Sequence, residues 1–62
     1  MLIKEMYDYY GNNWAKMARE LGFGTNTVFL WKTQGYVPIR SQMVIEKRTS
    51  GLFKADVEHA KV

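Results

Sequence analysis

Residues 25 to 33 combine an amide, hydroxyls and apolar side chains at helical spacing. On a helix, Asn26, Phe29 and Thr33 lie on one face, and Leu30 borders it. An amide can form a bidentate pair with adenine in the major groove of DNA, and apolar side chains can pack on the methyl group of thymine. Because the first two turns contain no basic residue that could take guanine, this face is suited to reading A·T base pairs.

The adjacent apolar residues Phe29 and Leu30 strengthen the interpretation of this face as a binding surface. Single exposed apolar residues are normal on a small domain. Two neighbours on the outer face of a short helix are better explained by a partner. That partner is either DNA or a protein that docks on the same face.

The net charge of +3 is concentrated in one part of the chain. Residues 1–31 and 49–62 each carry equal numbers of basic and acidic residues, so the whole excess lies within residues 32–48. The basic residues there, opposed only by Glu46, are Lys32, Arg40, Lys47 and Arg48. Such a cluster is typical of a phosphate-facing surface, although a solvated surface that keeps a protein soluble has the same composition. Beside the face described above we favour the phosphate-facing interpretation, with Lys47 and Arg48 as the weaker candidates.

Asn12 and Asn13 precede a helical pattern that begins at Trp14. Asn is a preferred N-cap because its side-chain oxygen accepts an N–H group of the first turn, so we expect one of the two to cap this helix. The remaining N–H groups and the positive helix end also bind phosphate readily. Lys16 lies off the apolar face of the same helix and can reach a phosphate.

Two helical patterns that meet at Gly22 would position these residues. The apolar residues of the first recur at i, i+3, i+4 and i+7: Trp14, Met17, Ala18 and Leu21. In the second, Val28 and Trp31 point inward. Gly22 is predicted to end the first helix in the left-handed conformation, which glycine adopts cheaply, and the Thr25 hydroxyl is predicted to cap the second. This succession predicts a helix-turn-helix at about residues 14–33.

The segments on either side of the motif complete a single domain. Residues 2–10 are predicted to form a short helix, ended by Gly11, whose inner face covers the motif. That face carries Ile3, Met6 and Tyr10. After the motif, residues 38–50 fit a helix with Pro38 in its first turn.

A β-hairpin from about 43 to 57 fits the C-terminal third as well. In this alternative, two strands flank the turn-forming residues Thr49, Ser50 and Gly51. Residues 58–62 are predicted to be a frayed tail in either case.

Composition excludes several classes of protein. The chain has 62 residues, of which 47% are hydrophobic and 15% aromatic, enough for one small domain with a core. The absence of Cys rules out disulfides and thiolate metal sites, and it fits a reducing cytoplasm. No apolar run approaches the ~20 residues of a membrane span. With His59 as the only histidine and no Gly-rich phosphate loop, we expect no enzyme, no metal and no cofactor.

The motif and the tail together resemble the Cro repressors of lambdoid phages and their prophage-borne relatives. In the motif, the spacing and types of four residues are similar to the phage-repressor helix-turn-helix: Ala18, Gly22, Val28 and Trp31. In the tail, the similar residues are Val37-Pro38, Ile45-Glu46, Thr49, Gly51 and Ala55-Asp56. The resemblance covers roughly residues 2–57, and the first motif is moderately specific.

The resemblance implies the fold and the residues that contact DNA. Cro-like proteins occur in all-helical form and with a C-terminal hairpin, and the tail of this chain looks like the all-helical branch. We therefore expect an all-α domain of about five short helices. The positions that would read bases are Thr25, Asn26, Phe29, Leu30 and Thr33, with Gly24 able to contribute only its backbone. The expected phosphate ligands are Asn12, Asn13, Lys16, Lys32 and Arg40.

The implied function is sequence-specific repression of transcription in the cytoplasm of a bacterial host. One recognition helix reads only a few base pairs, so we expect a homodimer on a palindromic operator, with half-sites about one helical turn apart. The dimer is expected to be weak, or to form only on DNA. The alternative is a protein-interaction module, such as a small regulatory partner in a prophage or toxin–antitoxin operon.

Overall fold

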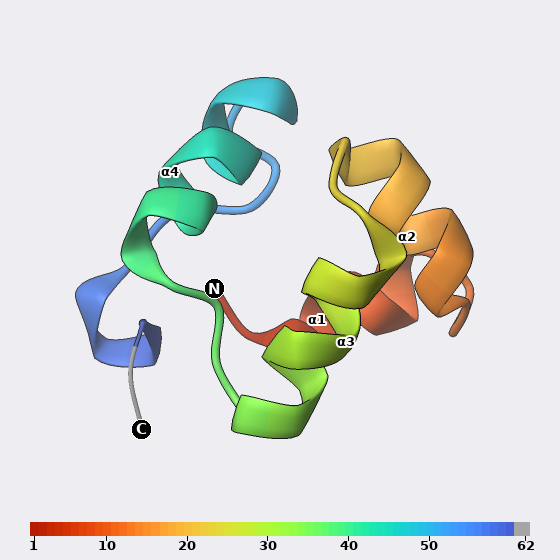
Figure 1. Ribbon diagram of the computed structural model, residues 1–62. Coiled ribbons are helices and arrows are strands. Elements are labelled where there is room, and N and C mark those ends of the chain that lie inside the picture. Colours follow the sequence, from red (N-terminus) through yellow and green to blue (C-terminus); the bar gives the residue numbers. More distant parts are fainter. Residues whose placement is uncertain (61–62) are drawn as a thin grey trace.

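The computed structural model describes residues 1–60, which form four α-helices and one 3-10 helix joined by short connections (Figure 1). The elements are α1 (Ile3–Tyr9), α2 (Trp14–Leu21), α3 (Thr25–Gln34), α4 (Ile39–Arg48) and η1 (Val57–His59). No strand occurs within the described residues, so the prediction of an all-α fold is confirmed. None of the helices in this range has both the length and the apolar character needed to cross a membrane.

Helix α4 occupies the segment for which the hairpin was the alternative, and the hairpin does not form. The helix buries Gln42 and Ile45 on one face. Its hydrogen bonding runs into the turn that follows: the Thr49 N–H donates to the Ile45 carbonyl (2.9 Å) and the Gly51 N–H to the Glu46 carbonyl (2.8 Å). The helix begins one residue later than predicted, because Pro38 is its N-cap.

The core is formed by one face of each α-helix together with the tail. Its buried apolar residues are Met1, Met6, Tyr10, Met17, Ala18, Leu21, Val28, Trp31, Val37, Ile45 and Phe53. The contact between α2 and α3 is the most extensive between any two of the helices. The inward positions predicted for Ala18, Val28 and Trp31 are therefore confirmed, whereas Trp14 is only half-buried.

The turn between α2 and α3 depends on Gly22, as predicted. This residue is the C-cap of α2 and has φ 78°, in the left-handed region that favours glycine. The Arg48 guanidinium, from the end of α4, donates hydrogen bonds to the carbonyls of Leu21 (2.8 Å) and Gly22 (3.0 Å). A cation at this end also complements the helix dipole, so Arg48 joins α4 to the end of α2.

The predicted Thr25 cap is wrong. Gly24 is the N-cap of α3, its backbone is extended, and no side chain caps the helix. The Gly24 carbonyl already accepts the N–H groups of Thr27 (3.1 Å) and Val28 (3.2 Å). Thr25 is therefore the first residue inside the helix, from which its hydroxyl cannot take the capping position.

Helix α1 packs on the tail through aromatic side chains. The ring centroids of Tyr9 and Phe53 are 5.5 Å apart and those of Tyr10 and Phe53 are 6.2 Å apart. The predicted inward positions of Met6 and Tyr10 are confirmed. Of the tail predicted to fray, residues 58–62, residues 58 and 59 belong to η1 (Val57–His59) and Ala60 is its C-cap, while residues 61–62 lie outside the described residues.

One fully buried polar side chain, Gln42, connects the two ends of the chain. Its amide nitrogen donates to the carbonyls of Val37 (2.8 Å) and His59 (3.1 Å). Its amide oxygen accepts from the Met1 amine (3.2 Å) and the Asp56 N–H (2.9 Å). All the hydrogen-bonding capacity of the amide is thereby used, which compensates for its burial.

The Asp56 carboxylate gives the fold a dependence on pH. The Met1 amine donates to it (2.6 Å) and the His59 ring lies 2.7 Å away, and these contacts hold the pKa of Asp56 well below its usual range. A carboxyl with a lowered folded-state pKa stabilises the protein above its ordinary pKa of 3.8, and this contribution is lost as the pH falls toward the folded-state value.

We therefore expect Asp56→Asn to destabilise the protein at neutral pH, with a difference from wild type that shrinks below about pH 4. Urea midpoints of both proteins between about pH 2 and pH 7 measure it. A constant difference across this range would contradict the role of the Asp56 charge.

Candidate nucleic-acid interface

The outer face of α3 is apolar and exposed. Phe29 is 42% exposed and Leu30 is 57% exposed, while Val28 and Trp31 on the opposite face are buried in the core. The helix thus carries apolar residues on two opposite sides, only one of which the fold uses. The predicted outward orientation of Phe29 and Leu30 is confirmed by their exposure.

The polar residues of this face differ in what they can offer a partner. Asn26 is exposed, and within residues 1–60 no hydrogen bond engages its side-chain amide, so the amide donors and acceptor are available to a partner. The Thr33 hydroxyl donates to the Phe29 carbonyl (3.0 Å), which leaves its oxygen lone pairs and its methyl group. Thr25 is exposed on the first turn, and Gly24 before it presents only backbone.

The N-terminus of α2 carries the predicted cap. Asn13 Oδ1 accepts the N–H group of Lys16 at 3.0 Å, so Asn13 rather than Asn12 is the cap, and its amide N–H groups remain for another acceptor. Asn12 has φ 57°, a left-handed conformation that Asn tolerates, and its backbone N–H donates to the Tyr7 carbonyl (2.8 Å). The Asn12 and Lys16 side chains belong to exposed residues.

Three aromatic rings connect this end of α2 to the outer face of α3. We call Tyr7, Trp14 and Phe29 the aromatic cluster. The rings of Tyr7 and Trp14 stack with centroids 4.1 Å apart, and those of Trp14 and Phe29 are 6.3 Å apart. The Lys32 ammonium lies 5.4 Å from the Trp14 ring centroid and 5.8 Å from that of Phe29. The structure therefore brings Lys32 together with the N-terminus of α2.

The other basic candidates lie elsewhere. Arg40 is exposed on the first turn of α4, a helix on the opposite side of the ribbon from α2 (Figure 1). Arg48 is engaged with the carbonyls at the end of α2 and lies 5.4 Å from the Phe23 ring, so its charge serves the fold.

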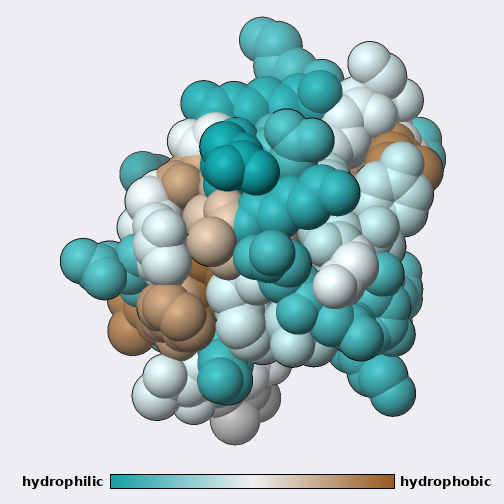
Figure 2. Space-filling view, turned by 90° about the vertical axis from the view of Figure 1, so that its right-hand side faces the viewer, coloured by the Kyte–Doolittle hydropathy of each residue, from teal (hydrophilic) through white to brown (hydrophobic). Residues whose placement is uncertain are grey.

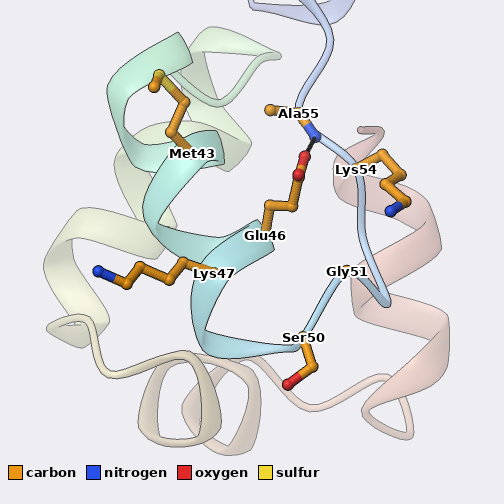
Figure 3. Close-up of a pocket in the computed structure, with 7 residues that line it drawn as sticks. All are labelled: Met43, Glu46, Lys47, Ser50, Gly51, Lys54 and Ala55. Atoms are coloured by element: carbon orange, nitrogen blue, oxygen red, sulfur yellow. Dashed lines mark hydrogen bonds between the residues drawn. The ribbon is translucent and has the colours of Figure 1, made fainter.

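Lys47 lines a separate open groove of about 550 Å³ between α4 and the tail (Figure 3). Its other lining residues are Met43, Glu46, Ser50, Gly51, Lys54 and Ala55. The Glu46 carboxylate accepts the Ala55 N–H group at 2.6 Å, so Glu46 holds the tail against α4.

The side of the molecule that α2 occupies in Figure 1 is mostly hydrophilic, and its apolar residues are gathered in small patches (Figure 2). Among the described residues, no group of three His, Asp or Glu side chains lies together as a metal site would require. Comparison of the chain with protein-family models, curated proteins and solved structures finds no match. The geometry of the residues themselves therefore carries the functional argument.

Sequence reasoning missed two features of this region. The first is the aromatic cluster, whose three residues belong to three different helices, so that no local pattern in the sequence indicates their contact. The second is the role of Arg48. A basic residue in the last turn of a predicted helix was available as a signal, but nothing local in the sequence indicates that it bonds to a turn 26 residues earlier.

Proposed function

We propose that the protein is a sequence-specific DNA-binding repressor of transcription of the Cro type, with α3 in the major groove of a palindromic operator. The observation that carries the proposal is the outer face of α3. It exposes Phe29 and Leu30 beside the unengaged amide of Asn26, while the same helix is fixed to the core from its other side. An α-helix fits the major groove, where an amide and apolar groups distinguish A·T pairs.

Phosphate contacts would come from residues around this face. Asn13 and Lys16 lie at the start of α2, and the Lys32 ammonium of α3 lies over Trp14, the first residue of the same helix. Together these three residues would hold one stretch of backbone. Asn12 and Arg40 complete the proposed set. The proposal needs neither a metal nor a cofactor, and it includes no catalytic step.

A homodimer is part of the proposal, because a single helix contacts too few base pairs to find an operator. Two copies on a palindrome would place their α3 helices about one turn of DNA apart. In a bacterial cytoplasm such a protein would act as a weak dimer, or would dimerise only on its operator.

The second candidate is a protein-interaction module that uses the same face. The exposure of Phe29 and Leu30 favours it, since apolar neighbours also suit a protein partner. The two candidates differ in their response to salt: phosphate binding weakens steeply as salt rises, whereas an apolar contact does not.

Selection from a pool of randomised DNA duplexes at near-physiological salt tests the proposal. Enrichment of a short palindrome is expected, with A·T pairs under α3. Residual binding that disappears as salt rises, without enrichment, would show a merely basic surface and would favour the protein-interaction module.

Asn26→Ala is expected to weaken binding to the selected palindrome by about 1–3 kcal/mol and to leave binding to random duplex nearly unchanged. The amide makes no hydrogen bond within the described residues, so the fold should keep its stability. Titrations with both duplexes measure the change, the random duplex being the internal control. Equal losses on both would refute Asn26 as a base reader.

A further inference from the structure

The aromatic cluster fixes a charged side chain that would otherwise be mobile. Lys32 is exposed, yet its ammonium lies within 6 Å of two ring centroids, those of Trp14 (5.4 Å) and Phe29 (5.8 Å). This separation is within the range of a cation–π attraction. Trp14 is itself half-buried and stacked on Tyr7 (4.1 Å), so the ring beneath the ammonium has a fixed position.

Holding Lys32 in place lowers the conformational entropy that its side chain loses when it binds an anion. A lysine that binds phosphate loses side-chain freedom, and a group already held in place loses less of it. An ammonium resting on a ring keeps N–H donors on the side away from the ring. The arrangement therefore leaves Lys32 both ordered and able to donate outward.

We propose that Trp14 is a positioning residue for Lys32: the indole holds the ammonium where a DNA phosphate is to be bound. The inference rests on the proposed function and deepens it, because it assigns Trp14 to phosphate recognition although the indole ring offers no charge to the phosphate. Trp14 is the first residue of α2 and directly follows its N-cap, Asn13, so the ring that holds Lys32 belongs to the N-terminal end of that helix.

Two other roles for the same contacts predict different results. If the rings held Lys32 away from the DNA, removal of the indole would release the ammonium and raise affinity. If the indole served only the packing of α1 on α2, its removal would affect affinity to the same extent with or without Lys32.

A double-mutant cycle separates these cases. The proteins are wild type, Trp14→Leu, Lys32→Gln and the double variant, each titrated with random duplex over a range of salt. Lys32→Gln is expected to lower the log–log salt slope by about one unit. Trp14→Leu is expected to lower affinity by about two- to fivefold when Lys32 is present and to have no further effect in Lys32→Gln.

Trp14→Phe is the matched control, because it keeps an aromatic face beneath the ammonium and should retain most of the affinity. Urea unfolding of every variant checks the fold. If Trp14→Leu unfolds, Trp14→Met, which is apolar and has no ring, takes its place in the cycle.

The results test the proposed function and the positioning role of Trp14 separately. A wild-type protein that binds no duplex overturns the proposed function and this inference together. Duplex binding with equal effects of Trp14→Leu in both backgrounds, or with a gain in affinity, overturns only the positioning role of Trp14. Loss of affinity confined to proteins that contain Lys32 supports it.

Discussion

Gln42→Leu is expected to lower the free energy of unfolding by about 3–5 kcal/mol, although leucine has nearly the volume of glutamine and is apolar. The substitution leaves two carbonyls, those of Val37 and His59, without the donor they now have. It also removes the acceptor of the Met1 amine and of the Asp56 N–H. A buried polar group without a partner costs about 1–3 kcal/mol, and stability of a domain this small is expected to be marginal.

Urea denaturation followed by circular dichroism measures this loss. Gln34→Leu is the matched control, because that glutamine is only half-buried and makes one hydrogen bond, to the Tyr36 carbonyl (2.9 Å). We expect about 1 kcal/mol or less for the control. If Gln42→Leu cost no more than Gln34→Leu, the four hydrogen bonds of Gln42 would contribute no more to stability than the single one of Gln34.

The second large effect is expected at Gly22, where an alanine would meet two obstacles. The left-handed backbone, with φ 78°, costs an L-residue about 1–2 kcal/mol. A Cβ atom would also clash with Arg48 Nη1, which must then give up its hydrogen bonds to the Leu21 and Gly22 carbonyls. Together we expect Gly22→Ala to cost about 2–4 kcal/mol.

Gly35→Ala separates the two causes. Gly35 has φ 89° and nothing within 4 Å of the position of a Cβ atom, so only the backbone cost of about 1–2 kcal/mol applies. The excess loss at Gly22 should disappear when both proteins are compared in an Arg48→Ala background. Unfolding midpoints of these variants provide the measurement, and equal losses at Gly22 and Gly35 would contradict the part assigned to Arg48.

The sequence was most informative where structure is determined locally. The 3.6-residue period of Met17, Ala18 and Leu21, and the left-handed conformation of Gly22, depend on residues at most a few positions apart. Both were predicted, and so was the outward orientation of Phe29 and Leu30, because burial of Val28 and Trp31 fixes the rotation of α3.

Features that depend on contacts between distant residues were not predictable in this way. The Met1 amine reaches Asp56 across 55 residues and Gln42 across 41 residues, and Arg48 reaches Leu21 across 27 residues. Residues 38–57 were ambiguous for the same reason, since helix and hairpin fit the local pattern and tertiary packing decides between them. The prediction of Thr25 as the N-cap was wrong by one residue. A shift of one residue at the start of a helix turns an N-cap into the first position inside the helix.

The two tryptophans occupy such different surroundings that the intrinsic fluorescence of the protein contains two separate signals. Trp31 is buried and edge-on to Phe23, with ring centroids 4.9 Å apart, so its emission reports whether the core is intact. Trp14 is half-buried beneath the Lys32 ammonium, so its emission is sensitive to whatever approaches that charge. In Trp14→Phe the remaining emission follows unfolding alone, and the part lost relative to wild type isolates the response of the surface to a ligand. One unlabelled sample can therefore distinguish a ligand that binds from one that unfolds the protein.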